Sequence, residues 1–89
     1  MPQVWIPALL RDLAGGQQTV HMPGKTVRQV IENLEVQYPG IKARLCQGEK
    51  LRSSIIVTVD GEISLLGLRQ GLQEASEVHL LPAISGGAT

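Results

Sequence analysis

The chain has 89 residues, which is the size of one small domain with a single hydrophobic core. Its hydrophobic content of 43% is almost entirely aliphatic, with one Trp, one Tyr and no Phe, so we expect a folded chain whose core is Leu, Ile and Val. Eight basic and eight acidic residues balance, and no basic stretch is interleaved with aromatic residues, which argues against a nucleic-acid partner.

The cysteine content and the N-terminal segment predict a location inside the cell. Cys46 is the only cysteine, which excludes an intramolecular disulfide and a zinc site built from several cysteines, and fits a reducing cytoplasm. The N-terminus lacks the basic start and long apolar run of a signal peptide, and no stretch is long enough to span a membrane. We therefore expect a cytoplasmic protein without a membrane partner.

The first part of the chain predicts a wide β-hairpin. Polar and apolar residues alternate over 3–6, as in a strand, until Pro7 interrupts pairing. Leucines over 9–13 are spaced as in a short helical turn, which Gly15-Gly16 ends. Residues 18–22 then predict a second strand that pairs with the first.

A helix over 26–38 is the clearest element of the sequence. Its apolar residues recur at i, i+3, i+4, i+7 and i+11, which is one face of a helix: Val27, Val30, Ile31, Leu34 and Tyr38. Thr26 and Gln29 have the spacing of a capping box, and Pro39-Gly40 cannot continue the helix. The apolar face predicts that this helix covers a sheet.

The middle of the chain predicts a second hairpin. Residues 41–45 suit a helical turn, and 51–59 are rich in β-branched residues, as in a strand. The strand ends at Asp60-Gly61, a strong hairpin signal, so 62–66 is the expected return strand.

The last part of the chain predicts a connecting turn at 68–72 and a final strand at 78–84. The order hairpin, helix, hairpin and final strand is an α+β pattern in which one helix covers one mixed sheet. We expect one domain over 1–84 and a flexible tail over 85–89 that contains Gly86-Gly87 followed by a two-residue extension.

The final strand leads into Gly86-Gly87 without a charged side chain from Val78 onward. Glycine passes where any Cβ would collide, so such a tail can thread a narrow channel in another protein, although a double glycine also occurs in frayed chain ends. Its surroundings resemble the MoaD/ThiS family of sulfur carriers in four segments, in the family's order. These are Leu10-Arg11-Asp12-Leu13-Ala14-Gly15-Gly16, Gly24-Lys25-Thr26-Val27, Tyr38-Pro39-Gly40 and Pro82-Ala83-Ile84-Ser85-Gly86-Gly87.

The resemblance implies a ubiquitin-like β-grasp fold, in which the first and last strands lie side by side in a mixed sheet around one main helix. It also implies that a ubiquitin-activating-type enzyme adenylates the carboxylate of Gly87. A sulfur donor would then convert it to a thiocarboxylate that gives sulfur to an acceptor enzyme in cysteine, thiamine, molybdopterin or related biosynthesis. Gly86 would let the tail thread the active site. The chain itself would be neither an enzyme nor a cofactor protein.

The sequence departs from the family pattern after the double glycine, where Ala88-Thr89 locks the Gly87 carbonyl in a peptide bond. An amide cannot be adenylated. By resemblance to family members with short extensions, we expect a zinc-dependent JAMM-type peptidase to cleave between Gly87 and Ala88. The alternatives are a permanently blocked tail with a non-covalent role, or an unusual activating enzyme that tolerates the extension.

If the first and last strands pair, Trp5, Pro7 and Leu81 share the sheet face opposite the helix. An apolar patch there, near the tail, would dock a partner unless a flanking loop covers it. Cys46 lies near no His or Asp in the sequence, and His21 and His79 lack ligand spacing, so we predict neither a nucleophile nor a metal site.

Two other functions fit the same fold. A ubiquitin-like protein modifier would use the activated Gly87 to form isopeptide bonds with lysines of target proteins. A non-covalent β-grasp interaction domain would use its sheet face alone, and would keep its function when Gly87 is replaced.

Overall fold

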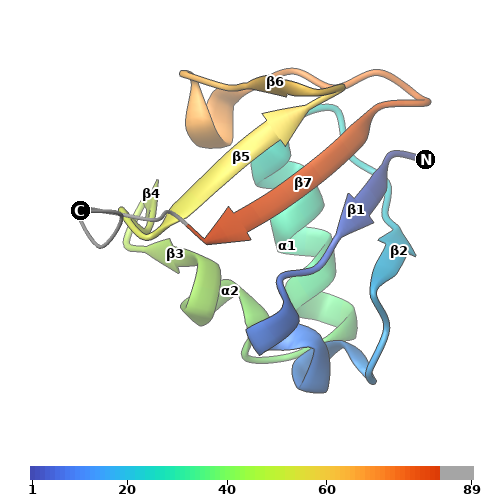
Figure 1. The fold of residues 1–89 in the computed structure, drawn as a ribbon, viewed down its shortest axis with the longest axis vertical. Helices are drawn as coiled ribbons and strands as arrows, with labels where there is room; N and C mark the ends of the chain where they lie inside the picture. Colours follow the sequence, from blue (N-terminus) through green and yellow to red (C-terminus); the bar gives the residue numbers. More distant parts are fainter. Residues whose placement is uncertain (83–89) are drawn as a thin grey trace.

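A mixed sheet lies over one main helix in the computed structural model, which describes residues 1–82 (Figure 1). The strand order is β2-β1-β7-β5-β6. The strands of this sheet are β1 (Gln3–Trp5), β2 (Thr19–His21), β5 (Ile55–Val59), β6 (Glu62–Ile63) and β7 (Glu77–Pro82). Two further strands, β3 (Cys46–Gln47) and β4 (Lys50–Leu51), form a separate antiparallel pair.

The first and last strands lie side by side in the middle of the sheet, as predicted. β1 pairs with β7 in parallel, with Val4 opposite Val78, whereas the other pairs of this sheet are antiparallel. A parallel pair needs a long crossover, and the main helix α1 (Val27–Gln37) lies within it. The ubiquitin-like β-grasp fold is thereby confirmed.

Helix α1 begins and ends where its flanking residues predict. The Thr26 side chain accepts a hydrogen bond from the Gln29 backbone N–H at 3.2 Å. The Gln29 side chain accepts from the backbone N–H of Lys25 at 2.8 Å, one residue before the usual capping-box partner. The helix ends at Gln37, and the backbone N–H of its C-cap residue Tyr38 donates to the Leu34 carbonyl just before Pro39.

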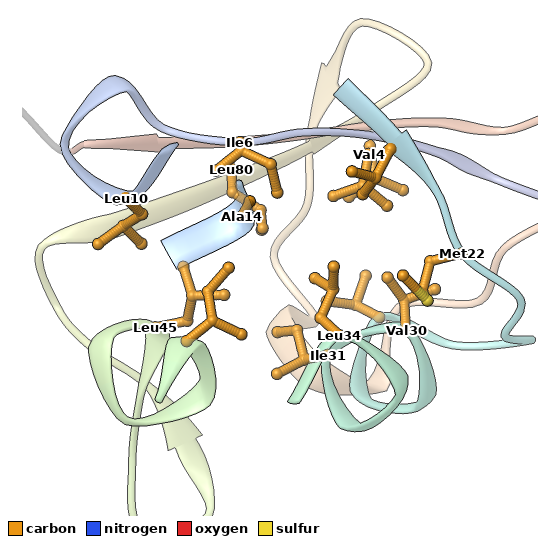
Figure 2. Packing of buried hydrophobic residues seen from close by; sticks show 14 of the residues in the cluster. Val4, Ile6, Leu10, Ala14, Met22, Val30, Ile31, Leu34, Leu45 and Leu80 are labelled. Carbon is orange, nitrogen blue, oxygen red and sulfur yellow. The ribbon is translucent and has the colours of Figure 1, made fainter. Parts of the chain in front are cut away.

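The core lies between α1 and the facing side of the sheet. In Figure 2, Val4 and Leu80 lie on the sheet side of the core, and Val30, Ile31 and Leu34 lie on the helix side. These side chains are at most 1% exposed, so their full hydrophobic area is removed from water. The short helices η1 (3-10, Ala8–Ala14) and α2 (Ile41–Leu45) close one end of this core through Leu10, Ala14, Ile41 and Leu45.

Glu35 joins the end of α1 to the start of α2. Its carboxylate accepts hydrogen bonds from the backbone N–H groups of Gly40 at 3.0 Å and Lys42 at 2.8 Å. These bonds favour the ionised form and hold the pKa of Glu35 below its usual value. The side chain thus caps α2 from a neighbouring helix.

Four predicted strands were too long, and one pair of strands was missed. The expected strands 3–6 and 18–22 exceed β1 and β2 only at their ends, whereas the other two are longer by several residues. The expected strand 51–59 is interrupted at 52–54, where Ile55 donates to the Arg52 carbonyl in a turn, so Leu51 belongs to β4 and pairs with Cys46. The expected return strand 62–66 ends at Ile63, because the Ser64 hydroxyl accepts from the Leu66 N–H and turns the chain. The Asp60-Gly61 hairpin is confirmed: both residues have positive φ, 53° and 88°.

The last strand begins at Glu77 and reaches Pro82, the last described residue, so the proposed boundary after residue 84 lies outside the described part. A second 3-10 helix, η2 (Gly67–Arg69), overlaps the start of the predicted turn at 68–72. None of the helices in residues 1–82 is both long and apolar enough to cross a membrane.

Leu34→Ala tests the packing of α1 on the sheet. Leu34 is fully buried, so its truncation should lower the free energy of unfolding by about 2–5 kcal/mol in urea denaturation. Val36→Ala on the exposed side of the same helix should change it by no more than about 0.5 kcal/mol. Equal effects of the two substitutions would contradict the packing described here.

Candidate functional site

The end of β7 is the point from which the chain leaves the sheet. β1 pairs with β7 only as far as Trp5 opposite His79, whereas β5 continues beside it until Ile55 lies opposite Pro82. The sheet therefore fixes the position and direction of the chain up to Pro82. The predicted site residues Gly86, Gly87 and Ala88 follow it and lie outside the described residues.

Alternation along β7 puts His79 and Leu81 on the face of the sheet opposite α1, because Val78 and Leu80 are buried toward the core. The imidazole of His79 stacks on the indole of Trp5, with ring centroids 4.9 Å apart and planes within 9°. The indole Nε1 is buried, and no hydrogen-bond acceptor from residues 1–82 contacts it.

This outer face is apolar around the end of β7. Leu81 is 42% exposed and lies opposite Ile56 of β5, and Ile63 of β6 is 65% exposed beside Thr58. Trp5 and Leu81 are therefore brought to one face, as predicted. The name outer patch is used below for five residues of this face: Trp5, Ile56, Ile63, His79 and Leu81.

Pro7 does not belong to the outer patch. The strand alternation that would have put it beside Trp5 stops because β1 ends at Trp5, and Pro7 is buried at the N-cap of η1. It lines a groove of about 500 Å³ on the other side of β7, which we call the exit groove. The residues that line it are Pro7, Ala8, Leu9, Leu10, Arg44, Arg52, Ser54, Ile55 and Pro82.

Sequence reasoning missed the exit groove because its walls come from segments far apart in the chain. Leu9 and Leu10 belong to η1, Arg44 to α2, and Arg52 to the turn between β4 and β5. The available signal was Leu9, an apolar residue of the predicted helical turn, which is 84% exposed in the structure.

The other conspicuous side chains have structural surroundings. Cys46 is buried, and burial raises the pKa of its thiol, which disfavours the nucleophilic thiolate. Glu74 accepts a hydrogen bond from the N-terminal amine at 2.7 Å, and this contact lowers the pKa of its carboxyl. Over residues 1–82, no three His, Cys, Asp or Glu side chains gather as metal ligands would.

Comparison with known proteins agrees with this geometry. A sequence model of the ThiS family matches residues 4–87. The sulfur carrier protein CysO of Mycobacterium tuberculosis is 36% identical, in an alignment that covers 94% of this chain and 96% of that protein.

Solved structures resemble the fold over nearly the whole chain. A chain in the crystal structure of the Amycolatopsis orientalis BexX/CysO complex has a TM-score of 0.90 at 37% identity, covering 98% of this chain and all (100%) of that one. The solution structure of small archaeal modifier protein 1 from Methanosarcina acetivorans has a TM-score of 0.79 at 29% identity, covering 97% and 95%.

His79→Ala tests the stacked pair of the outer patch. Loss of the imidazole should expose the indole of Trp5, the only tryptophan, and shift its fluorescence emission to longer wavelength. His21→Ala, which removes the other histidine at the exposed last residue of β2, should leave the emission unchanged. An unshifted spectrum for His79→Ala would show that the rings do not stack in solution.

Proposed function

The chain belongs to the ThiS family, and we propose that it carries sulfur in the cytoplasm as a thiocarboxylate on Gly87. Its homology to CysO sulfur carrier proteins supports a sulfur carrier role. The observation that carries the finer proposal is that the family match runs through Gly86 and ends at Gly87, the second glycine. The protein would be a sulfur carrier on which other enzymes act, rather than a catalyst.

The chemistry requires activation of the Gly87 carboxylate. The anionic group resists nucleophiles, so a ubiquitin-activating-type enzyme would first use ATP to form an acyl-adenylate and release pyrophosphate. A sulfide equivalent from a sulfur donor then attacks the carbonyl carbon, the C–S bond forms, and AMP leaves with the oxygen. Because Gly86 and Gly87 have no Cβ, the backbone can enter a narrow active site. An acceptor biosynthetic enzyme finally takes the sulfur.

Activation needs a free carboxyl group at Gly87, so the bond between Gly87 and Ala88 must be hydrolysed first. A JAMM-type metallopeptidase supplies suitable chemistry, since its metal ion activates water for attack on the amide. The metal would belong to the peptidase, and this chain would supply only the scissile bond.

The outer patch supports docking of the activating enzyme. Gly87 lies five residues beyond Pro82, a distance that an extended chain spans in at most about 17 Å. An enzyme that holds Gly87 therefore lies against the end of the sheet, where Trp5 and Leu81 offer apolar area. Pro7 lies on the other side of β7, and its role would be to fix the start of η1 next to the end of the sheet.

Protein modification is the second candidate function. It is favoured by the similarity to small archaeal modifier protein 1 of Methanosarcina acetivorans at 29% identity. The same activated Gly87 would then be attacked by the amine of a target lysine, with AMP as the leaving group. A non-covalent interaction domain is the third candidate, and it would use only the outer patch.

Intact mass spectrometry of the protein from its own cells tests the proposed function. We expect loss of Ala88-Thr89 and replacement of one oxygen by sulfur at Gly87. Gly87→Ala should abolish the sulfur exchange, whereas Gly71→Ala, at an exposed glycine without positive φ where an added Cβ meets no atom within 4 Å, should retain it. An untrimmed and unmodified mass under sulfur demand would refute the carrier proposal, and lysine-linked conjugates would identify a modifier instead.

Leu81→Asp tests docking through the outer patch. A charge at this exposed position should raise the KM of the activating enzyme for the protein by about tenfold with kcat little changed, since contact area is lost but Gly87 is intact. Val36→Asp, on the exposed side of α1, is the control and should leave KM unchanged. Equal KM values for both variants would exclude the outer patch from this contact.

A further inference from the structure

The exit groove is lined by apolar side chains and two arginines. Pro7, Leu10, Ile55 and Pro82 supply its apolar lining, and Arg44 and Arg52 line it without any carboxylate among the lining residues. Leu9 also lines it and is 84% exposed. The combination of an open apolar surface and two guanidinium groups is characteristic of protein interfaces, where arginine is enriched.

Neither arginine is neutralised within the described part of the chain. The ion pairs of residues 1–82 involve Met1 with Glu74, Arg28 with Glu49, and Lys42 with Glu32, but not Arg44 or Arg52. Arg52 also borders a neighbouring depression that holds Glu35, but that carboxylate accepts from the backbone of Gly40 and Lys42 instead.

Arg52 is nevertheless fixed in position. Its Nε donates to the Ala43 carbonyl at 3.0 Å, which anchors the guanidinium against α2. Its terminal nitrogens have no acceptor in residues 1–82, and no side-chain hydrogen bond of Arg44 occurs there either. A guanidinium that is already anchored loses less conformational entropy when a carboxylate binds it.

The tail brings a partner to this groove. Pro82 lines the groove, and Gly87 is within about 17 Å of it by chain length alone. The side chains of residues 83–89 are uncharged, so they provide no side-chain carboxylate for the two arginines. The acidic group that the tail does carry is its α-carboxylate, which the proposed function puts in the active site of the activating enzyme. A side-chain carboxylate for the two arginines would therefore come from that enzyme.

We propose that the exit groove docks a segment of the adenylating enzyme in which an apolar side chain stands next to one or two carboxylates. The apolar side chain would lie against Leu9 and Ile55, and the carboxylates would pair with Arg44 and Arg52. This inference rests on the proposed function, since it names the partner that activates Gly87. It adds a second contact surface, on the side of β7 opposite to the outer patch.

Binding of the protein ending at Gly87 to the adenylating enzyme of the same organism tests this proposal, with calorimetry for Kd and pyrophosphate release for adenylation. Leu9→Asp and Arg44→Glu should each raise Kd by about tenfold. Arg44→Lys should retain most of the affinity, and added salt should weaken the unmodified protein more than Arg44→Glu. The matched controls are Val36→Asp, equally exposed, and Lys25→Glu, the same charge change outside the groove.

The outcomes separate this proposal from the proposed function. Unchanged Kd values for Leu9→Asp and Arg44→Glu, or no binding at all, would overturn docking in the groove. Tighter binding by Leu9→Asp would also overturn it, by showing that the chain's own tail competes for the groove. Binding that depends on the groove residues without pyrophosphate release would support the docking and refute activation of Gly87. Circular dichroism melting of each variant checks that it is folded.

Discussion

The parallel pairing of β1 with β7 is the contact on which the rest of the structure depends. It joins the two ends of the described chain at the centre of the sheet, with Val4 beside Val78, both fully buried. β2 is attached only through β1, and β5 and β6 only through β7. The pairing therefore joins the two halves of the sheet into one surface that α1 can cover (Figure 1). It also sets η1, which follows β1, next to the end of β7.

Alternation along β7 divides its side chains between the core and the outer face of the sheet. Val78 and Leu80 belong to the core, while His79 and Leu81 face outward next to Trp5. At Pro82 the strand passes between two apolar surfaces, the outer patch and the exit groove. The net charge of the chain is zero, but charges of opposite sign lie at opposite ends of β7. Acidic residues gather near the start of the strand and arginines near its end. The acidic residues are Asp60, Glu62, Glu74 and Glu77.

Elements whose signals are local were predictable from the sequence. Helix α1 has its cap, its apolar face and its terminating Pro39 within a short stretch, and the Asp60-Gly61 turn specifies its own backbone geometry. The parallel pairing of β1 and β7 has no local signal, and it was expected from the family resemblance alone. The break at 52–54 was missed because a β-branched run looks continuous, whereas the β3–β4 pair redirects the chain through contacts that propensity does not describe.

The candidate site shows the same division. Trp5 and Leu81 were placed correctly because strand alternation extends to both, and Pro7 was misplaced because β1 ends before it. The exit groove combines η1, α2 and the turn before β5, so no sequence window contains it.

These two surfaces matter for function because the proposed chemistry at Gly87 uses only backbone atoms, which are the same in every protein. Under the proposed function, recognition of this protein by its partners would therefore come from side chains that the fold holds within reach of the tail. The outer patch and the exit groove are the surfaces of the described residues that meet this requirement.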